Sequence, residues 1–294
     1  IPAIMSTRVI EDRRDRLVSI LILPLLTCSA RLPVYAMVTA LLFAGSPVKA
    51  GLTFAGAYGL GIVMALVMAL IFKKSILPGE SRPLILELPG YKLPSLRNAL
   101  LTMWDRGLIF LKKAGTIILL ISIILWAMAT YPKMPEGYVE ANAPSEVVAE
   151  LNELAQAAAA AEEAGDLEAA EEFAARADAI TSSYAMGYSL AGRIGHAVEP
   201  IFNPLGFDWR INVGIMTSFA ARETVVSTLA IVYGIGEDGA EDTASLRDTL
   251  LAQVKLDGSP MFSFPTCMAL LVFYVLAMQC LPTQAITRRE TGSW

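Results

Sequence analysis

The sequence has 294 residues, of which 55% are hydrophobic and 17% are charged, and its mean hydropathy is +0.53. This composition is too apolar for an ordinary soluble domain of that length and predicts a membrane protein. The net charge of −5 comes from residues 145–180, which hold ten acidic side chains and one arginine. The remainder is slightly basic, but no basic patch is interleaved with aromatic residues, so nucleic acid is not an expected partner.

The chain begins with Ile1 rather than Met and no signal-peptide pattern follows, so we expect a segment of a longer protein. Five stretches are long and apolar enough to cross a bilayer as helices, which takes about 20 residues. The first and the fourth carry charged or helix-breaking residues at their centres, whereas the other three are uncharged. The sequence therefore predicts an all-α fold, a polytopic membrane helical bundle. In chain order the stretches are residues 17–45, 51–72, 115–131, 211–236 and 262–287.

Clusters of Lys and Arg flank these stretches. By the positive-inside rule, the ends of the stretches that carry these clusters lie in the cytoplasm. Apolar residues at helical spacing over residues 94–113 predict a helix lying along the cytoplasmic interface. Residues 144–184, rich in Ala and Glu, predict a helical hairpin on the outer side. Its acidic face is either a solvated surface or a means of concentrating cations. This orientation requires residues 189–207 to cross or re-enter the membrane.

The chain divides into three predicted parts. Residues 1–131 hold the first of two repeated broken-helix segments, the gate repeats described below, together with membrane spans and the interfacial helix. Residues 132–186 form the soluble acidic insertion. Residues 187–294 hold the second gate repeat and a last membrane span.

The two interrupted stretches share a motif. Residues 27–34 (TCSARLPV) and 218–225 (SFAARETV) both read Ser/Thr-x-Ser/Ala-Ala-Arg-x-x-Val, between two apolar half-length segments. This pattern predicts two internally repeated broken-helix segments, which we call gates. Transporters with such repeats place substrate sites where discontinuous helices meet, because free backbone groups are tolerated only inside protein or beside a cavity.

Charged residues at mid-membrane are functional candidates, because burying them costs several kcal/mol. Arg31 and Arg222 cannot bind a metal, so they have a structural or gating role, or each bonds to carbonyls freed at its own helix break. Glu223 is different, because its carboxylate could accept a cation or pair with Arg31.

Softer donors lie close to the same breaks. Cys28 lies at the first break. Met278, Gln279 and Cys280 precede Pro282 in the last apolar stretch. Thiol and thioether groups suit late first-row metals better than magnesium or calcium, although helix packing would use the same residues. The candidate metal ligands are thus Cys28, Glu223, Cys280 and Met278, and the candidate path and gate residues are Ser29, Arg31, Pro33, Arg222, Thr224 and Gln279.

The sequence holds no phosphate-binding loop with Lys-Ser/Thr and no zinc-protease His pair, so no hydrolytic activity is expected of it.

These motifs resemble, in this order, the membrane domain of the ferrous iron transport protein B family. The resemblance covers nearly the whole chain except the acidic insertion, which looks like a variable loop. The segments that carry it include residues 1–5 (IPAIM), 28–35 (CSARLPVY), 219–223 (FAARE), 277–283 (AMQCLPT) and 288–294 (RRETGSW).

The resemblance implies uptake of Fe(II) as the transported ion across the bacterial cytoplasmic (inner) membrane, along a path lined by the gates. Family members carry a cytoplasmic GTP-binding domain, so GTP and magnesium would act only through that domain, which this sequence does not contain. Implied partners are membrane lipid, that GTPase domain, small accessory proteins of the same system and a second copy of the chain. Two alternatives stay open: a carrier of an organic solute such as a nucleoside, and a non-transporting membrane anchor of a signalling GTPase.

Overall fold

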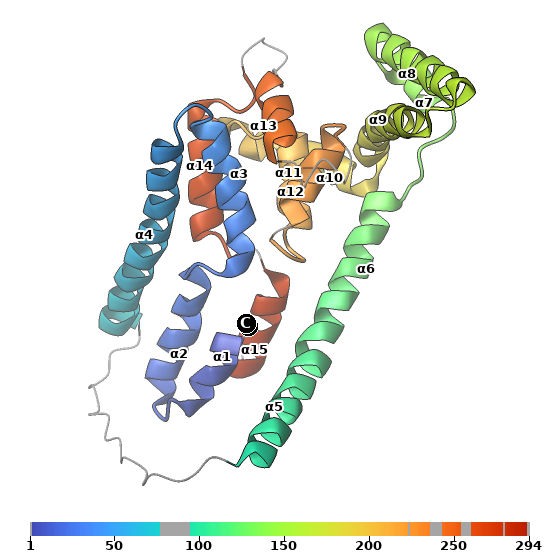
Figure 1. Cartoon of the computed structure of the whole chain (residues 1–294). Helices are drawn as coiled ribbons and strands as arrows, with labels where there is room; N and C mark the ends of the chain where they lie inside the picture. Colours follow the sequence, from blue (N-terminus) through green and yellow to red (C-terminus); the bar gives the residue numbers. More distant parts are fainter. Residues whose placement is uncertain are drawn as a thin grey trace.

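The computed structural model describes residues 2–76, 95–222, 224–235, 243–253, 260–278 and 280–292. Over these residues the regular elements are helices, which assemble into a bundle of long rods with a smaller helical cluster at one end (Figure 1). Three helical segments within them, Arg13–Leu42, Pro47–Ser75 and Phe264–Thr291, are long and apolar enough to cross a membrane. The predicted all-α membrane bundle is confirmed.

One span is a single unbroken helix, and a second is longer than the apolar stretch from which it was predicted. Helix α4 (Pro47–Ile71) ends in a π-helical turn, Phe72–Ile76. Helix α5 (Leu96–Phe110) joins α6 (Thr116–Thr130) through a second π-helical turn, Leu111–Gly115, and the three form one rod in Figure 1.

Helix α5 is therefore collinear with α6, and the interfacial placement of residues 94–113 stays a prediction. The Leu111 N–H still bonds to the carbonyls of Gly107 and Leu108, so helical hydrogen bonding continues through the junction and α5 extends along the axis of α6. Residues 111–130 alone rise about 30 Å, enough to cross the hydrocarbon.

The first gate is a broken helix, as predicted. Helix α2 (Arg13–Ile22) ends at two 3-10 turns, η2 (Leu23–Leu25) and η3 (Ser29–Arg31), after which α3 (Leu32–Leu42) continues the path. Figure 1 shows α3 above α2 on nearly the same line. Prolines at the start of η2 and of α3 explain the break, since proline lacks the N–H that a helix interior needs.

The last span has a comparable break. Helix α14 (Phe264–Leu276) stops at Ala277, whose backbone is extended, and α15 (Leu281–Thr291) begins with a proline in its first turn. The chain passes this break and continues to the opposite end of the bundle (Figure 1).

The second gate has a different geometry, because its two helices fold back on each other. The Thr217 and Thr228 hydroxyls, from α11 (Trp209–Thr217) and α12 (Thr224–Val232), lie 2.9 Å apart. Gly214 packs against the side chain of Leu229, so the helices run antiparallel. Residues 218–222 form the tip of this hairpin. Both of its open ends lie at α9 (Leu167–Tyr188), where Gly187 faces Trp209 and the Ser183 hydroxyl donates to the Val232 carbonyl.

The expectation that residues 189–207 cross or re-enter the membrane stays a prediction, and the hairpin of residues 209–232 is a second candidate for re-entry. Helix α10 (Leu190–Phe202) and the 3-10 turn η6 (Asn203–Leu205) stay beside the outer end of the hairpin, where His196 stacks on Trp209 at 4.7 Å. The 13 residues of α10 are too few to span a bilayer.

The acidic insertion forms the predicted helical hairpin. Helix α7 (Tyr138–Asn142) precedes α8 (Ser145–Ala164), and α9 (Leu167–Tyr188) returns antiparallel after Gly165, whose φ of 78° suits a left-handed turn. The remaining helices are α1 (Pro2–Ser6), η1 (Thr7–Val9) and α13 (Thr243–Ala252).

The main core joins α3, α4, α12, α13 and α14 around side chains that are almost completely buried. Its members include Tyr35, Leu229, Leu246 and Tyr274. This core holds both gates and the last span in fixed relative positions.

Close packing of α10 on α11 gives a first test of the hairpin. A methyl group at Gly195 would lie 2.8 Å from both the Trp209 carbonyl oxygen and the Val213 Cγ2 atom. We expect Gly195→Ala to lower the free energy of unfolding by about 1–3 kcal/mol, because the helices must separate. Thermal unfolding in detergent checks this against Gly56→Ala, whose added methyl meets open space. Equal melting temperatures of the two variants would contradict the packing.

Candidate functional site

Three interruptions of the backbone meet inside the bundle. They are the first break (residues 23–31), the hairpin tip (residues 218–222) and the last break (described at residues 277, 278 and 280), and we call their meeting place the break junction. The Ala277 carbonyl accepts from both Arg31 Nη2, at 3.4 Å, and Arg222 Nη2, at 2.8 Å. The tip is further tied to the last break by the Leu281 N–H, which donates to the Phe219 carbonyl at 3.0 Å.

Arg31 stabilises the first break from within. Its side chain is fully buried, and it donates to the Pro24 carbonyl at 3.0 Å and the Leu25 carbonyl at 3.2 Å. These carbonyls lack helical partners because the chain leaves α2 at this point. Of the two roles considered for Arg31, bonding to the carbonyls of its own break is therefore the one that these contacts fit.

Arg222 bonds instead to another segment. Its guanidinium donates to the Tyr274 carbonyl at 3.3 Å and to Ala277, both on the last span. Of the two roles considered for Arg222, these bonds fit a structural role between segments, because the hairpin brings the tip against α14. A hydrogen bond to a charged group contributes about 1.5–3 kcal/mol, so this arginine is a strong link between the second gate and the last span.

The candidate metal ligands gather near the same arginine. Cys28 is exposed and Cys280 is half-buried, and both side chains lie within electrostatic range of the Arg222 guanidinium. Met278 is also half-buried, and its carbonyl accepts from Gln284 Nε2 at 2.9 Å. Glu223 and Gln279 lie outside the described residues. Among the described residues, no three His, Cys, Asp or Glu side chains form a group that could hold a metal.

The predicted gate-shaping residues lie at the helix starts. Ser29 begins η3 and Pro33 stands in the first turn of α3, both with exposed side chains. The Thr224 hydroxyl bonds to the Ala221 carbonyl at 2.7 Å and the Thr217 carbonyl at 3.1 Å. Thr224 therefore closes the hairpin across its tip.

Two tyrosines at the junction were not predicted. Tyr35 and Tyr274 are fully buried, and both interact electrostatically with Arg222. Tyr35 lies four residues after Arg31 and Tyr274 three before Ala277, each within an apolar run. A tyrosine within an apolar run is ordinarily a core residue, so the sequence carries no separate signal for these two.

Helix α4 supports the first break from the side. A Cβ at Gly61 would lie 3.3 Å from the Thr27 Oγ1 atom and 3.5 Å from the Leu25 carbonyl oxygen. The absence of a side chain at this position lets α4 approach the broken backbone closely.

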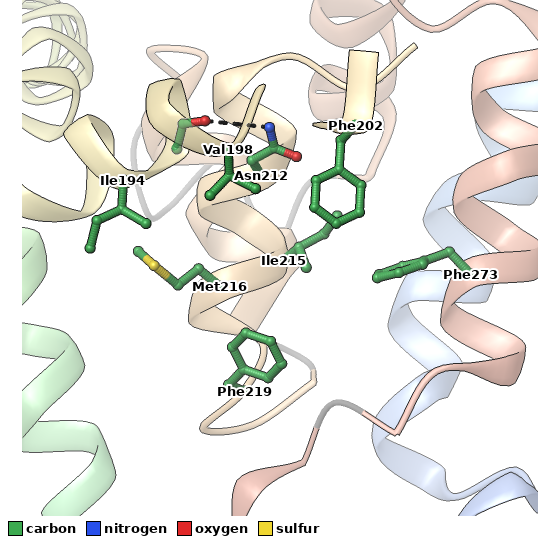
Figure 2. Close-up of a pocket in the computed structure, with 9 residues that line it drawn as sticks. Ile194, Val198, Phe202, Asn212, Ile215, Met216, Phe219 and Phe273 are labelled. Atoms are coloured by element: carbon green, nitrogen blue, oxygen red, sulfur yellow. Dashed lines mark hydrogen bonds between the residues drawn. The ribbon is translucent and has the colours of Figure 1, made fainter. Parts of the chain in front are cut away.

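A separate apolar cavity of about 250 Å³ lies along the other side of the hairpin, between α10, α11 and α14 (Figure 2). Among its lining residues is Asn212, whose Nδ2 donates to the Gly195 carbonyl at 3.4 Å. At its lower end Phe219 belongs to the tip (Figure 2). Its mainly hydrocarbon walls do not suit a metal ion. The other lining side chains are Ile194, Val198, Phe202, Ile215, Met216 and Phe273.

Comparison with known proteins gives two family matches. Residues 54–106 match a family described as the ferrous iron transport protein B C terminus, and residues 111–294 match the Gate family, described as nucleoside recognition. No solved structure matches.

Curated relatives are similar over the whole chain. It is 38% identical to a Fe(2+) transporter FeoB of Leptospira interrogans, over 100% of this chain and 37% of the relative. It is 35% identical to an Fe(2+) transport protein A/Fe(2+) transporter FeoB fusion protein of Porphyromonas gingivalis, over 100% of this chain and 33% of the relative. A FeoB of Helicobacter pylori is 32% identical over 99% of this chain and 42% of the relative.

The chain spans between a third and about two fifths of the length of these relatives. The Gate match covers more than half of the chain, and the similarity to the transporters is continuous. The chain therefore belongs to the Gate family, and over its whole length it is similar to a part of Fe(2+) transporters named FeoB.

Proposed function

We propose that this chain forms the membrane part of a ferrous-iron importer, and that Fe(II) passes through the break junction. The observation that carries the proposal is the meeting of three backbone breaks around the Ala277 carbonyl, with Cys28 and Cys280 beside Arg222. Freed carbonyls and thiols offer exchangeable ligands, and a site with few strong donors releases its ion readily.

We further propose the ligand roles in detail. Cys28, Glu223, Cys280 and Met278 contact the ion, while Ser29, Pro33, Thr224 and Gln279 shape the path. Arg31 and Arg222 hold the breaks together and bind no metal.

The proposed setting is the bacterial cytoplasmic membrane, with the basic ends of α2 and α15 inside and the acidic insertion outside. Helix α6 then runs outward and the re-entrant hairpin returns to the outer side, so the last span ends in the cytoplasm (Figure 1). In the intact protein a GTPase domain controls opening. The relative named as a fusion with Fe(2+) transport protein A supports a small accessory partner.

The relatives' printed names favour iron over the other two functions considered. A nucleoside carrier finds support in the description of the Gate family, but the three relatives described above are named as Fe(2+) transporters or a fusion containing one. A pure membrane anchor would have no use for two buried arginines at helix breaks, given their cost in a bilayer.

Uptake of radiolabelled Fe(II) tests the proposal. In cells lacking their own importer, we expect Cys28→Ser in the full-length protein to reduce anaerobic uptake roughly tenfold, a change of about 1.4 kcal/mol. The matched control is Cys267→Ser, because that thiol is 1% exposed within the main core. Equal uptake by the two variants at matched expression would remove Cys28 from the path.

A further inference from the structure

A cluster of one carboxylate and two guanidiniums joins three helical segments at the basic end of the bundle. Arg8 of η1 donates through Nε to Glu290 Oε2 at 2.8 Å, and its Nη2 bonds to Oε1 of the same carboxylate. Arg16 of α2 donates through Nη2 to Glu290 Oε2 at 2.9 Å. We call these three residues the clasp.

The clasp is better shielded from water than a surface ion pair. The Glu290 side chain is 4% exposed, against 44% for Arg8 and 29% for Arg16. Beneath it, Ile4 and Ile286 form a small apolar core with a third isoleucine from α2. Bidentate contacts between arginine and a carboxylate are specific in direction as well as in charge, so the clasp sets how these segments approach one another.

The segments joined by the clasp lead directly to the break junction. Helix α2 runs from Arg16 into the first break, which carries Cys28. Helix α15 starts just after Cys280 and reaches Glu290 within nine residues, a rise of about 14 Å. A change in the angle between α2 and α15 at the clasp therefore changes the distance between the two thiols.

We propose that Glu290 is a positioning residue of the transporter: its clasp with Arg8 and Arg16 holds α2 and α15 together and keeps the cytoplasmic end of the path closed. This inference rests on the proposed function for the direction of the path. Arg8 lies on the segment before α2, so displacement of that segment opens the clasp and releases α15. Without the carboxylate, the two guanidiniums repel each other and drive the same movement.

Thiol accessibility tests the clasp without using iron. Inverted membrane vesicles holding the full-length protein are treated with a membrane-impermeant maleimide, and modification of Cys28 and Cys280 is followed by peptide mass spectrometry. We expect Glu290→Gln to speed labelling of at least one of these thiols about tenfold, which needs a shift of only about 1.4 kcal/mol in the opening equilibrium. The exchange Arg16→Glu/Glu290→Arg restores the ion pair between α2 and α15 with its charges reversed and should return labelling part of the way toward the original rate.

Two controls separate positioning from general destabilisation. Arg176→Gln removes an exposed ion pair with Glu150 on the insertion and should leave labelling unchanged. Arg8→Gln retains the buried carboxylate and Arg16, and should give faster labelling even if Glu290→Gln fails to fold. Unchanged labelling in both clasp variants, or an equal increase in Arg176→Gln, would overturn the inference. If Cys28→Ser leaves uptake intact while the clasp variants still change labelling, the clasp stands and the proposed ion path falls.

Discussion

Replacing Arg222 by methionine is expected to reduce iron uptake at least a hundredfold. Methionine fills a similar length without charge, so the carbonyls of Tyr274 and Ala277 lose a buried donor. The Ala277 carbonyl keeps only its longer bond from Arg31, at 3.4 Å, and the Tyr274 carbonyl loses its bond from Arg222. Each lost bond to a charged group costs about 1.5–3 kcal/mol, and the loss of both is enough to release the hairpin tip from the last span. Uptake of Fe(II) at matched expression measures the effect.

Lysine at position 222 provides a graded comparison. It keeps the charge but lacks the planar fork that reaches two carbonyls at once, so we expect Arg222→Lys to retain only part of the uptake. Arg193→Met is the control, because Arg193 is exposed at the outer end and lies over the Tyr188 ring at 4.9 Å. Full uptake by Arg222→Met would show that the link between tip and last span is not needed for transport.

The interruptions in the spans were predictable from the sequence, whereas the chain directions were not. Prolines at positions 24 and 33 and a charged residue within an apolar run indicate a break whatever surrounds it. The repeated motif is the same whether the second helix continues or reverses. Reversal depends on contacts such as Thr217 with Thr228, which form only in the folded protein.

The same reasoning applies to the site. Cys28, Arg31, Arg222 and Cys280 were identified because polar side chains in apolar runs are conspicuous, and the structure brings them to one junction. The Ala277 carbonyl could not be identified, since every residue has one and only tertiary structure shows which is left without a helical partner. Tyrosine within an apolar segment is ordinarily a core residue, so Tyr35 and Tyr274 gave no separate signal.

In the acidic insertion, by contrast, both the helices and the turn between them could be predicted from the local sequence. Its hairpin was predicted in full because Gly165-Asp166 interrupts two stretches with strong helix formers, and local preferences suffice there. The join between α5 and α6 could not be predicted, because an apolar stripe with basic neighbours is typical of an interfacial helix and equally of a helix that continues a span. The continuous backbone hydrogen bonding at Leu111 shows that the two helices form one rod.

Enlarging Gly61 is expected to inhibit transport by displacing the first break. The Cβ of a leucine there would lie 3.3 Å from Thr27 Oγ1 and 3.5 Å from the Leu25 carbonyl oxygen, and the rest of the side chain would extend further. The backbone around Leu25 must shift, which weakens its bond to Arg31 and moves Cys28 away from the junction. Overpacking of this kind costs about 1–3 kcal/mol, so we expect uptake to fall at least tenfold in Gly61→Leu.

Two further variants serve as controls: Gly61→Ala and Gly59→Leu. Gly61→Ala requires only a small adjustment of Thr27, so we expect it to retain most of the uptake. Gly59→Leu lies on the same helix, but its Cβ meets open space, so this variant should transport normally. If the two leucine variants lose uptake equally, leucine in α4 is harmful for reasons unrelated to the break. A loss confined to position 61, together with slower maleimide labelling of Cys28, would place the sensitive contact between α4 and the first gate.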